Sequence, residues 1–284
     1  MQNTEKVGNS RGFVYAATGS SIYVDLAIRS ARSLKLQCPD IPIDLYTDQD
    51  VHDPVFSKVH KPEESWFRVK IDALINSRFQ ETVYIDADTY VIDDISDIFY
   101  LFQNYDICAC HDPGRNSEHG SAILDSHFPE SFPTLNGGLI GITKSEKSQE
   151  FLQLWKQTIQ SRNQLKDQPS FRELIWQSNL HLSILPPEYN IMFLRWLDVL
   201  GYKQGIPKII HSPKLHQHQK NNHKPINGLI DLLGTRRTIR LLKLLKRAGR
   251  DLPADWILFG EAGQGTNMKQ KMIQQYIQRT FGEC

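Results

Sequence analysis

The chain has 284 residues, of which 40% are hydrophobic and 23% charged, a composition typical of a folded globular protein. Its 33 basic and 32 acidic side chains give a formal net charge of +1, so no basic excess favours nucleic acid as a partner. No apolar run approaches the roughly 18 to 20 residues that span a bilayer, and the opening MQNTEKVGNS lacks an apolar signal-peptide core, so we expect a cytoplasmic protein.

Short apolar runs typical of strands alternate along the chain with longer amphipathic runs typical of helices. This order predicts an α/β protein with a largely parallel sheet. The first strand is expected at 13–17, followed by a turn at 18–21 and a helix with Ile22, Leu26 and Leu34 near one face. A short apolar piece lies at 55–59. Further strands are expected at 42–46, 82–86, 105–110, 139–143, 181–185 and 208–211, and further helices at 66–78, 145–161 and 169–178.

Composition changes divide the chain into three regions. We expect a flexible N-terminus at 1–10, a main α/β domain at 11–222, and a basic helical C-terminal appendage at 223–284. Within the main domain, the segment 111–135 is mostly polar and too long for an ordinary connection, which predicts a functional loop or lid.

Two carboxylates follow the strand predicted at 82–86, in the sequence Asp86-Ala87-Asp88. Ligands bind at the carboxyl ends of strands in open α/β sheets. Side chains two apart in an extended backbone point the same way, so this pair would repel unless a cation lay beside it. A hard divalent ion such as Mg²⁺ or Mn²⁺ is the natural occupant, and the alternative is a solvated turn.

Two enzyme classes place Asp-x-Asp directly after an apolar strand. In GT-A glycosyltransferases the pair binds a metal that neutralises a diphosphate leaving group. In haloacid-dehalogenase-like phosphatases the first Asp, here Asp86, is the nucleophile. That class needs Thr or Val where this chain has Tyr90, and the only Asp-Asp pair, at 93–94, follows too closely. A third possibility is a non-catalytic α/β scaffold whose basic C-terminal helix engages membrane or nucleic acid.

The wider pattern over residues 13–218 resembles glycosyltransferase family eight, the glycogenin-like and lipopolysaccharide-galactosyltransferase-like enzymes. The opening YAATGSSIYVDLAIRSARSLK, the Arg-x-Lys of 68–70 and the core motif YIDADTYVIDDISDIF carry this resemblance. Further matches in the same order are LYTD at 45–48, ACHD at 109–112, NGGL at 136–139, DQPS at 167–170, Tyr189-Asn190 and His211.

The resemblance implies a GT-A fold and a hexose transfer from a nucleoside-diphosphate sugar, as from a UDP-sugar, to a glycan, lipid-linked or other hydroxyl acceptor. It also implies that Asp86, Asp88 and His211 hold Mn²⁺ or Mg²⁺. The segment that begins at His211 reads HSPKLHQH and lacks the Gly and Trp of the family's usual ending. The chain therefore departs from the family in the segment that binds the diphosphate.

The base and ribose are expected over the small-residue turn after the first strand, because such a turn lets the backbone approach a ligand. Arg68, Lys70 and Lys214 are expected to neutralise phosphate or contact the donor sugar. Arg68 and Lys70 are two apart on the predicted helix, so only one is expected to reach the site. The full set expected to bind the donor is Ala16, Ala17, Thr18, Tyr23, Asp48, Arg68, Lys70, Ala87, Asn136, Gly137, Gly138 and Lys214.

Asp112, Asp167 and Gln168 are the candidate catalytic residues, offering polar groups for sugar hydroxyls or for the anomeric face. The amide of Gln168 cannot act as a strong base. If Gln168 lies beneath the anomeric carbon, as the resemblance implies, transfer with retention of configuration is expected.

Residues 235–250, TRRTIRLLKLLKRAGR, contain seven basic residues and no acid. At helical spacing Leu241, Leu242, Leu244 and Leu245 form an apolar stripe, with most of the charges on the opposite face. Such a helix suits peripheral contact with an anionic membrane, and the alternative is a helix packed on the main domain with a solvated basic face.

Overall fold

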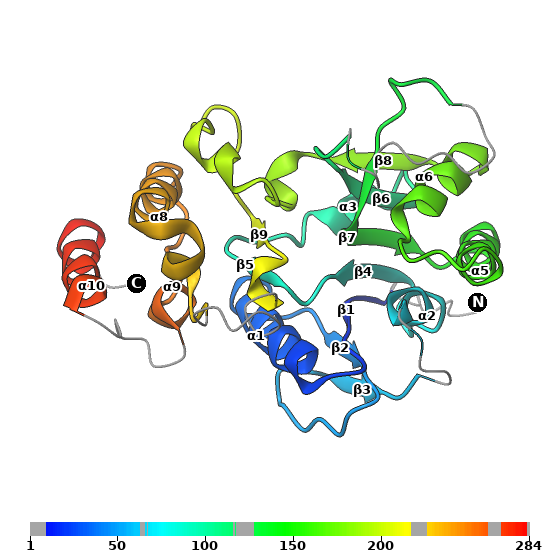
Figure 1. Cartoon of the computed structure of the whole chain (residues 1–284), viewed down its shortest axis with the longest axis horizontal. Coiled ribbons are helices and arrows are strands. Elements are labelled where there is room, and N and C mark those ends of the chain that lie inside the picture. The colour runs from blue at the N-terminus through cyan, green and yellow to red at the C-terminus, as the bar shows by residue number, and fades with distance from the viewer. Residues whose placement is uncertain are drawn as a thin grey trace, which may run out of the picture. The chain divides into compact units, whose positions relative to one another are not determined.

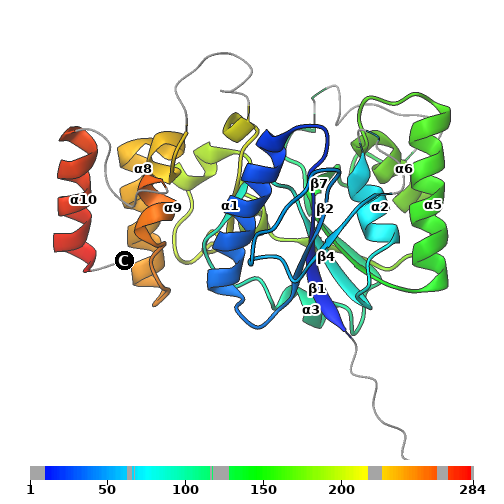
Figure 2. The same cartoon turned by 90° about the horizontal axis from the view of Figure 1, so that it is seen from below.

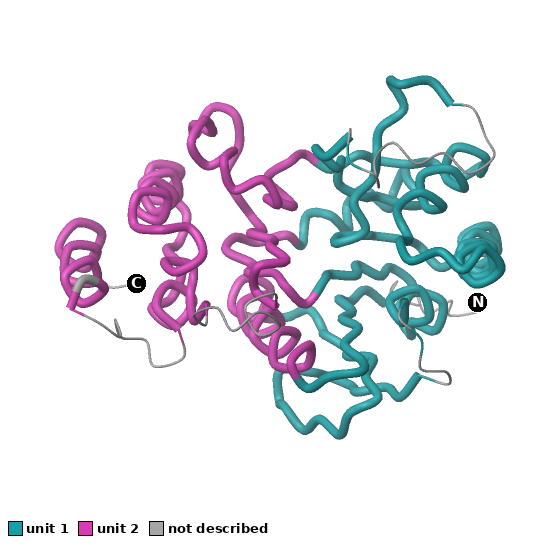
Figure 3. The backbone as a smooth tube through the Cα atoms, in the orientation of Figure 1, with its two compact units in different colours: residues 1–21, 40–86, 96–185 teal, residues 22–39, 87–95, 186–284 magenta. Residues whose placement is uncertain are grey.

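A computed structural model describes residues 10–62, 66, 68–115, 117, 128–216, 226–260 and 268–282, and Figures 1 and 2 show it from two sides. The chain forms two compact units (Figure 3). Unit 1 consists of residues 1–21, 40–86 and 96–185, and unit 2 of residues 22–39, 87–95 and 186–284. Both units are therefore assembled from segments that lie far apart in the sequence.

Unit 1 is built on a seven-stranded sheet in the order β3-β2-β1-β4-β7-β6-β8. Strand β7 is antiparallel to both of its neighbours, and the other pairs are parallel. The sheet is thus mixed and mostly parallel, as the alternation of strand and helix predicts. Its strands are β1 (Arg11–Ala16), β2 (Ile43–Tyr46), β3 (Lys58–His60), β4 (Glu81–Ile85), β6 (Ile107–His111), β7 (Leu135–Thr143) and β8 (Leu182–Leu185).

Helices α2 (Val69–Ile75), α5 (Glu146–Ser161) and α6 (Gln168–Gln177) cover one face of this sheet (Figure 2). The Ser145 side chain caps α5 by accepting from the Ser148 N–H, as expected for a helix start. Trp155 and Phe171 stack with ring centroids 4.6 Å apart, which joins α5 to α6 in a buried core. A short helix, α3 (Ile98–Leu101), was not predicted.

Several element boundaries in unit 1 differ from the sequence prediction, and two of these differences lie at the candidate site. Helix α2 begins at Val69, three residues later than expected, because Arg68 has non-helical dihedrals (φ −124°, ψ 41°). Strand β7 begins at Leu135, four residues earlier than expected, so that Asn136 and the glycines after it belong to the strand.

Unit 2 contains α1 (Ser21–Gln37) and a two-stranded antiparallel sheet of β5 (Thr89–Val91) and β9 (Ile209–His211). Strand β5 was not predicted. Two hydrogen bonds connect it to α1. The Ser30 and Thr89 hydroxyls lie 2.5 Å apart, and the Val91 N–H donates to the Ser33 hydroxyl. Further along lie two 3-10 turns, Pro187–Tyr189 and Leu194–Asp198, and the helices α8 (Leu229–Arg247), α9 (Asp255–Phe259) and α10 (Met268–Phe281).

Residues 223–284 do not form a unit of their own, because they cluster with the other segments of unit 2. Leu241, Leu242 and Leu245 are fully buried in a core that also contains Leu26 of α1 and Ile210 of β9. The apolar stripe of α8 is therefore covered by the protein itself. This agrees with the alternative in which the helix packs on the rest of the chain, rather than placing its leucines in a membrane. The assignment of residues 11–222 to a catalytic domain and of residues 223–284 to an appendage stays a prediction. Among the described residues, no helix is both long and apolar enough to cross a membrane.

The packing of α8 can be tested with two substitutions on the same helix. Leu241→Ala removes buried methyl groups and should lower the free energy of unfolding by about 2–5 kcal/mol. Lys243→Ala, at an exposed position, should change it by less than about 0.5 kcal/mol. Chemical denaturation measures both, and equal midpoints for the two variants would contradict the buried stripe.

Candidate functional site

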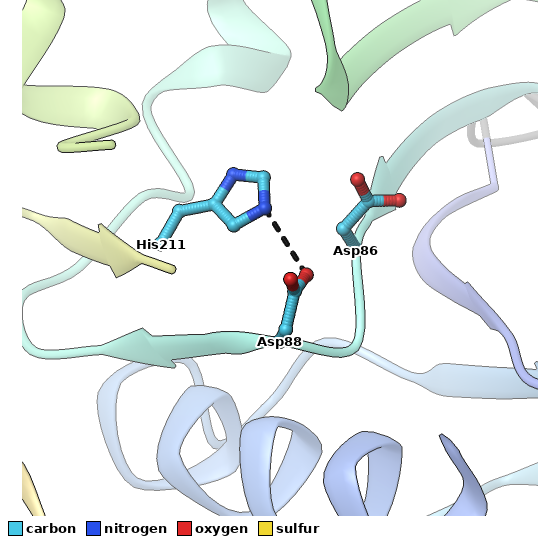
Figure 4. A group of neighbouring side chains, drawn as sticks. All are labelled: Asp86, Asp88 and His211. Atoms are coloured by element: carbon cyan, nitrogen blue, oxygen red, sulfur yellow. Dashed lines mark ion pairs between the residues drawn. The ribbon is translucent and has the colours of Figure 1, made fainter. Parts of the chain in front are cut away.

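The pairing of β5 with β9 places Asp88 beside His211. Thr89 is the Cα partner of His211, and the Ser212 N–H donates to the Asp88 carbonyl over 3.0 Å. The two side chains meet as a result, with His211 Nε2 3.1 Å from Asp88 Oδ1 (Figure 4). Two residues that are 123 positions apart in the numbering thus form one ion pair.

Asp86 completes a group of three possible metal ligands with Asp88 and His211. One ligand atom from each residue lies within 4.8 Å of the others (Figure 4). Two carboxylates and one imidazole are a donor set that suits Mn²⁺ or Mg²⁺, since both ions favour carboxylate oxygens and Mn²⁺ readily accepts a nitrogen ligand. The residues therefore fit the predicted cation, and a cation here would compete with a proton on His211 Nε2.

Three further side chains hold these ligands in place. Asn190 Oδ1 lies 2.8 Å from His211 Nδ1. Because an amide oxygen only accepts, Nδ1 carries a hydrogen, which leaves Nε2 as the nitrogen directed at Asp88. The Tyr84 hydroxyl donates to Asp86 Oδ1 over 2.7 Å, and His216 Nδ1 lies 3.3 Å from Asp88 Oδ2.

The sequence analysis assigned no role to Tyr84, Asn190 or His216. Tyr84 could have been found, because it lies two residues before Asp86 on the same strand and points to the same side. His216 and Asn190 carry no comparable local signal, since their contacts depend on how distant segments of unit 2 pack.

The charge of Asp88 is set by its two histidines. Burial alone would raise the pKa of its carboxyl, but the nearby His211 and His216 outweigh burial and hold the pKa well below its ordinary value. Asp88 is therefore an anion, which is the form that binds a metal.

A second polar group, in unit 1, is centred on an ion pair between Lys70 and Asp167. Arg68 Nε lies 3.4 Å from the other Asp167 oxygen, so both basic residues reach the same carboxylate. Arg68 can do so because it precedes the helix, so helical spacing does not set its direction. That only one of the two reaches the donor stays a prediction. Burial would lower the pKa of Lys70, but Asp167 and Asp86 outweigh it and raise the pKa, so Lys70 is charged.

Gly137 lies directly against this ion pair. Its carbonyl accepts from Lys70 Nζ over 3.3 Å. A Cβ at Gly137 would lie 2.8 Å from Lys70 Nζ and 3.2 Å from Asp167 Oδ2, so a larger residue would push the charges apart. The Gly138 carbonyl accepts from the Asp86 N–H over 2.9 Å, which links β7 to the acidic pair.

Asp112 forms hydrogen bonds with two other predicted residues of unit 1, Gln168 and Asn136. Its Oδ2 accepts from Gln168 Nε2 over 2.6 Å and from Asn136 Nδ2 over 3.1 Å. Gln168 Nε2 also donates to the Leu135 carbonyl over 3.2 Å. Both hydrogens of the Gln168 amide are therefore used within the protein, which leaves its Oε1 as the atom it can offer to a ligand.

The residues expected to bind the nucleotide fall into separate groups. In unit 1, the turn after β1 meets Asp48, which accepts from the Gly19 N–H at 3.2 and 3.0 Å. In unit 2, the Tyr23 and His216 rings lie 5.8 Å apart, and Lys214 is exposed. Ala16 and Thr18 are partly exposed and Ala17 is buried, while Ala87 packs on the core of unit 2.

Comparisons with known proteins identify the family and agree with the fold. The family model for nucleotide-diphospho-sugar transferases matches residues 29–217, about two thirds of the chain. A search of curated proteins finds no significant match.

Solved glycosyltransferase structures are similar to this chain. The galactosyltransferase LgtC in complex with donor and acceptor sugar analogues is 13% identical, with a TM-score of 0.51 over 71% of this chain and 87% of that chain. The glycosyltransferase GlyE of Streptococcus pneumoniae TIGR4 is 16% identical, with a TM-score of 0.53 over 86% of this chain and 66% of that chain. At these identities the likeness concerns the fold, which is the predicted GT-A fold.

The metal site predicts a loss of cation binding when a ligand is removed. Asp88→Ala deletes the carboxylate beside His211 and should weaken Mn²⁺ binding by more than about 100-fold, as measured by isothermal titration calorimetry. The exposed Asp97→Asn is the matched control and should bind as the wild type does. Undiminished Mn²⁺ binding by Asp88→Ala would show that the cluster is not the metal site.

The support from Asn190 gives a separate prediction. Asn190→Leu removes the acceptor for His211 Nδ1 while keeping a side chain that branches at Cγ, and should weaken Mn²⁺ binding about 10- to 100-fold. Asn190→Asp keeps an acceptor oxygen and should retain most of the affinity. If the leucine variant binds Mn²⁺ as tightly as the wild type, Asn190 does not orient the ligand.

Proposed function

The chain belongs to the nucleotide-diphospho-sugar transferase family and is a glycosyltransferase, and we propose that it moves a hexose from a UDP-sugar to a hydroxyl acceptor. The observation that carries this proposal is the group of Asp86, Asp88 and His211. Transfer leaves negative charge on the departing diphosphate, and Mn²⁺ or Mg²⁺ held by these residues would neutralise it.

The family assignment favours a glycosyltransferase over the two other functions that the Asp86-Ala87-Asp88 sequence allowed. A haloacid-dehalogenase-like phosphatase, with Asp86 as its nucleophile, is wrong, because the matched family transfers sugars from nucleotides. A non-catalytic α/β scaffold is wrong for the same reason.

We assign the donor-binding side chains according to their contacts. Lys70 is held as a cation beside Asp86 and Asp167, which suits it to a donor phosphate or sugar hydroxyl. Asp167 is buried and paired with Lys70 and Arg68, so its role is to position those cations. The turn of Ala16, Ala17 and Thr18, with Asp48 beside it, is assigned to base and ribose.

Gln168 is assigned to the anomeric face of the donor. Its Nε2 is held by Asp112 and the Leu135 carbonyl, so its Oε1 would face the positive charge that develops at the anomeric carbon. An amide oxygen is not a base. We therefore propose transfer with retention: the acceptor oxygen bonds to the anomeric carbon on the face from which the diphosphate leaves, and the departing oxygen takes the hydroxyl proton.

The acceptor is proposed to be a glycan or a lipid-linked sugar, in keeping with the acceptor analogue bound to LgtC. Peripheral contact of residues 235–250 with an anionic membrane at a cytoplasmic face also stays a proposal. It now rests on basic side chains alone, of which Arg236 and Lys243 are exposed, because the leucine stripe is buried.

A donor screen tests the proposed reaction. Nucleotide release should occur from UDP-glucose or UDP-galactose in the presence of Mn²⁺, and should stop on addition of EDTA or in Asp88→Ala. GDP-mannose and ADP-glucose should give little release and serve as controls. Release that EDTA does not affect, or that is confined to the control donors, would contradict the proposed donor and metal.

The stereochemistry gives a further prediction. An α-linked donor should give an α-linked product, because the only group assigned to the anomeric face is the weakly basic amide of Gln168. The anomeric proton of the product, followed by NMR, distinguishes the two outcomes. A β-linked product would mean that another residue acts as a base on the acceptor.

A further inference from the structure

Three aromatic side chains gather on unit 1 outside the residues assigned to the donor. Phe132 and Trp176 meet edge to face with ring centroids 4.9 Å apart, and Phe128 lies 6.0 Å from Phe132 and 6.4 Å from Trp176. Trp176 is 43% exposed, and both phenylalanines are partly exposed. We call these three residues the aromatic platform. A group of neighbouring apolar side chains that remains exposed at a surface can serve as a binding site.

The platform is continuous with the Gln168 site along helix α6. Gln168, Arg172 and Trp176 are spaced by four residues, so they lie along one side of that helix. At 1.5 Å per residue, Trp176 is about 12 Å along the helix axis from Gln168. The helix thus connects the residue assigned to the anomeric carbon with an exposed indole ring.

A second stretch of chain makes the same connection. Phe132 lies three residues before Leu135, whose carbonyl accepts from Gln168 Nε2, and four before Asn136, which donates to Asp112. Two independent segments therefore run from the Gln168 site to the platform.

Arg172 holds the platform in one arrangement. Its side chain is buried, and its Nε donates to the Pro133 carbonyl over 3.1 Å while its Nη2 donates to the Phe132 carbonyl. Its guanidinium also lies over the Phe128 ring, 4.3 Å from the centroid. These contacts fix the segment 128–133 against α6 before any ligand arrives, which lowers the entropy cost of binding.

We infer that the aromatic platform is a subsite for a pyranose ring of the acceptor glycan. One face of many pyranoses presents only C–H groups, which pack against the face of an indole or phenyl ring. The guanidinium of Arg172 is buried and engaged with backbone carbonyls, so the surface that the three rings themselves offer is apolar and suits the C–H face of a sugar. The inference rests on the proposed function, since the platform would hold the acceptor chain while its terminal hydroxyl reaches the donor near Gln168.

The test compares the full-length wild type with Trp176→Ala, with Trp176→Phe, which keeps a ring, and with Tyr100→Ala. Tyr100 is an exposed aromatic residue of α3, outside the platform, and serves as the matched control. Saturation-transfer NMR with lactose, maltotriose and cellotriose as probes measures sugar binding without turnover.

We expect ring C–H signals from at least one probe, and an affinity for that sugar that falls on the order of tenfold in Trp176→Ala. Trp176→Phe should recover part of it, and Tyr100→Ala should bind as the wild type does. The slow hydrolysis of the UDP-sugar by water should be unchanged in all variants. Its absence in the wild type would count against the proposed function, whereas its presence without sugar binding would count against the platform alone.

Three results would overturn the inference: no signal from any of the three sugars, a signal that survives Trp176→Ala, or equal losses in Trp176→Ala and Tyr100→Ala. Sedimentation velocity adds a further check. A dimer that dissociates in Trp176→Ala would assign the platform to a second copy of the chain and would also overturn the inference.

Discussion

The buried ion pair of Lys70 and Asp167 is the interaction on which the arrangement of unit 1 depends. Either charge alone in this environment would be unfavourable by several kcal/mol, and together they stabilise each other only at close range. A Cβ at Gly137, where β7 passes the pair, would lie 2.8 Å from Lys70 Nζ and would displace the end of that side chain. The ion pair thus joins the start of α2, the start of α6 and the adjoining strand at one point.

Gln168 lies next to this interaction in the chain. Asp167 is the residue at the N-terminal boundary of α6, and its carboxylate pairs with Lys70 and Arg68. Gln168 is the next residue, and its amide donates to Asp112 and to the Leu135 carbonyl. The start of one helix thus carries both the buried carboxylate and the neutral amide that would face the substrate.

A local pattern pointed to the acidic pair, because Asp86 and Asp88 directly follow an apolar strand. The resemblance to family eight added the other candidates, among them Lys70, Gln168 and His211, which no local pattern singles out.

The remaining details could not be predicted because they depend on long-range pairing. Strand β5 is only three residues long, and nothing in its composition indicates that it pairs with β9. Arg68, whose dihedrals are non-helical, likewise contacts Asp167 and the Leu165 carbonyl, which lie about 100 positions away in the chain. The leucines of α8 are amphipathic whether they face lipid or protein, so the spacing alone could not say which.

The interleaving of the two units along the chain has a consequence for biosynthesis. Leu26 of α1 packs in a core with Leu229 and Ile257, which leave the ribosome roughly 200 residues later. At about 5 to 20 residues per second, the apolar face of α1 would wait on the order of 10 to 40 seconds for these partners. During that interval only the earlier members of this core, such as Tyr90 and Ile92, are available to the helix, so the yield should depend on translation speed and on chaperones that shield incompletely buried surfaces.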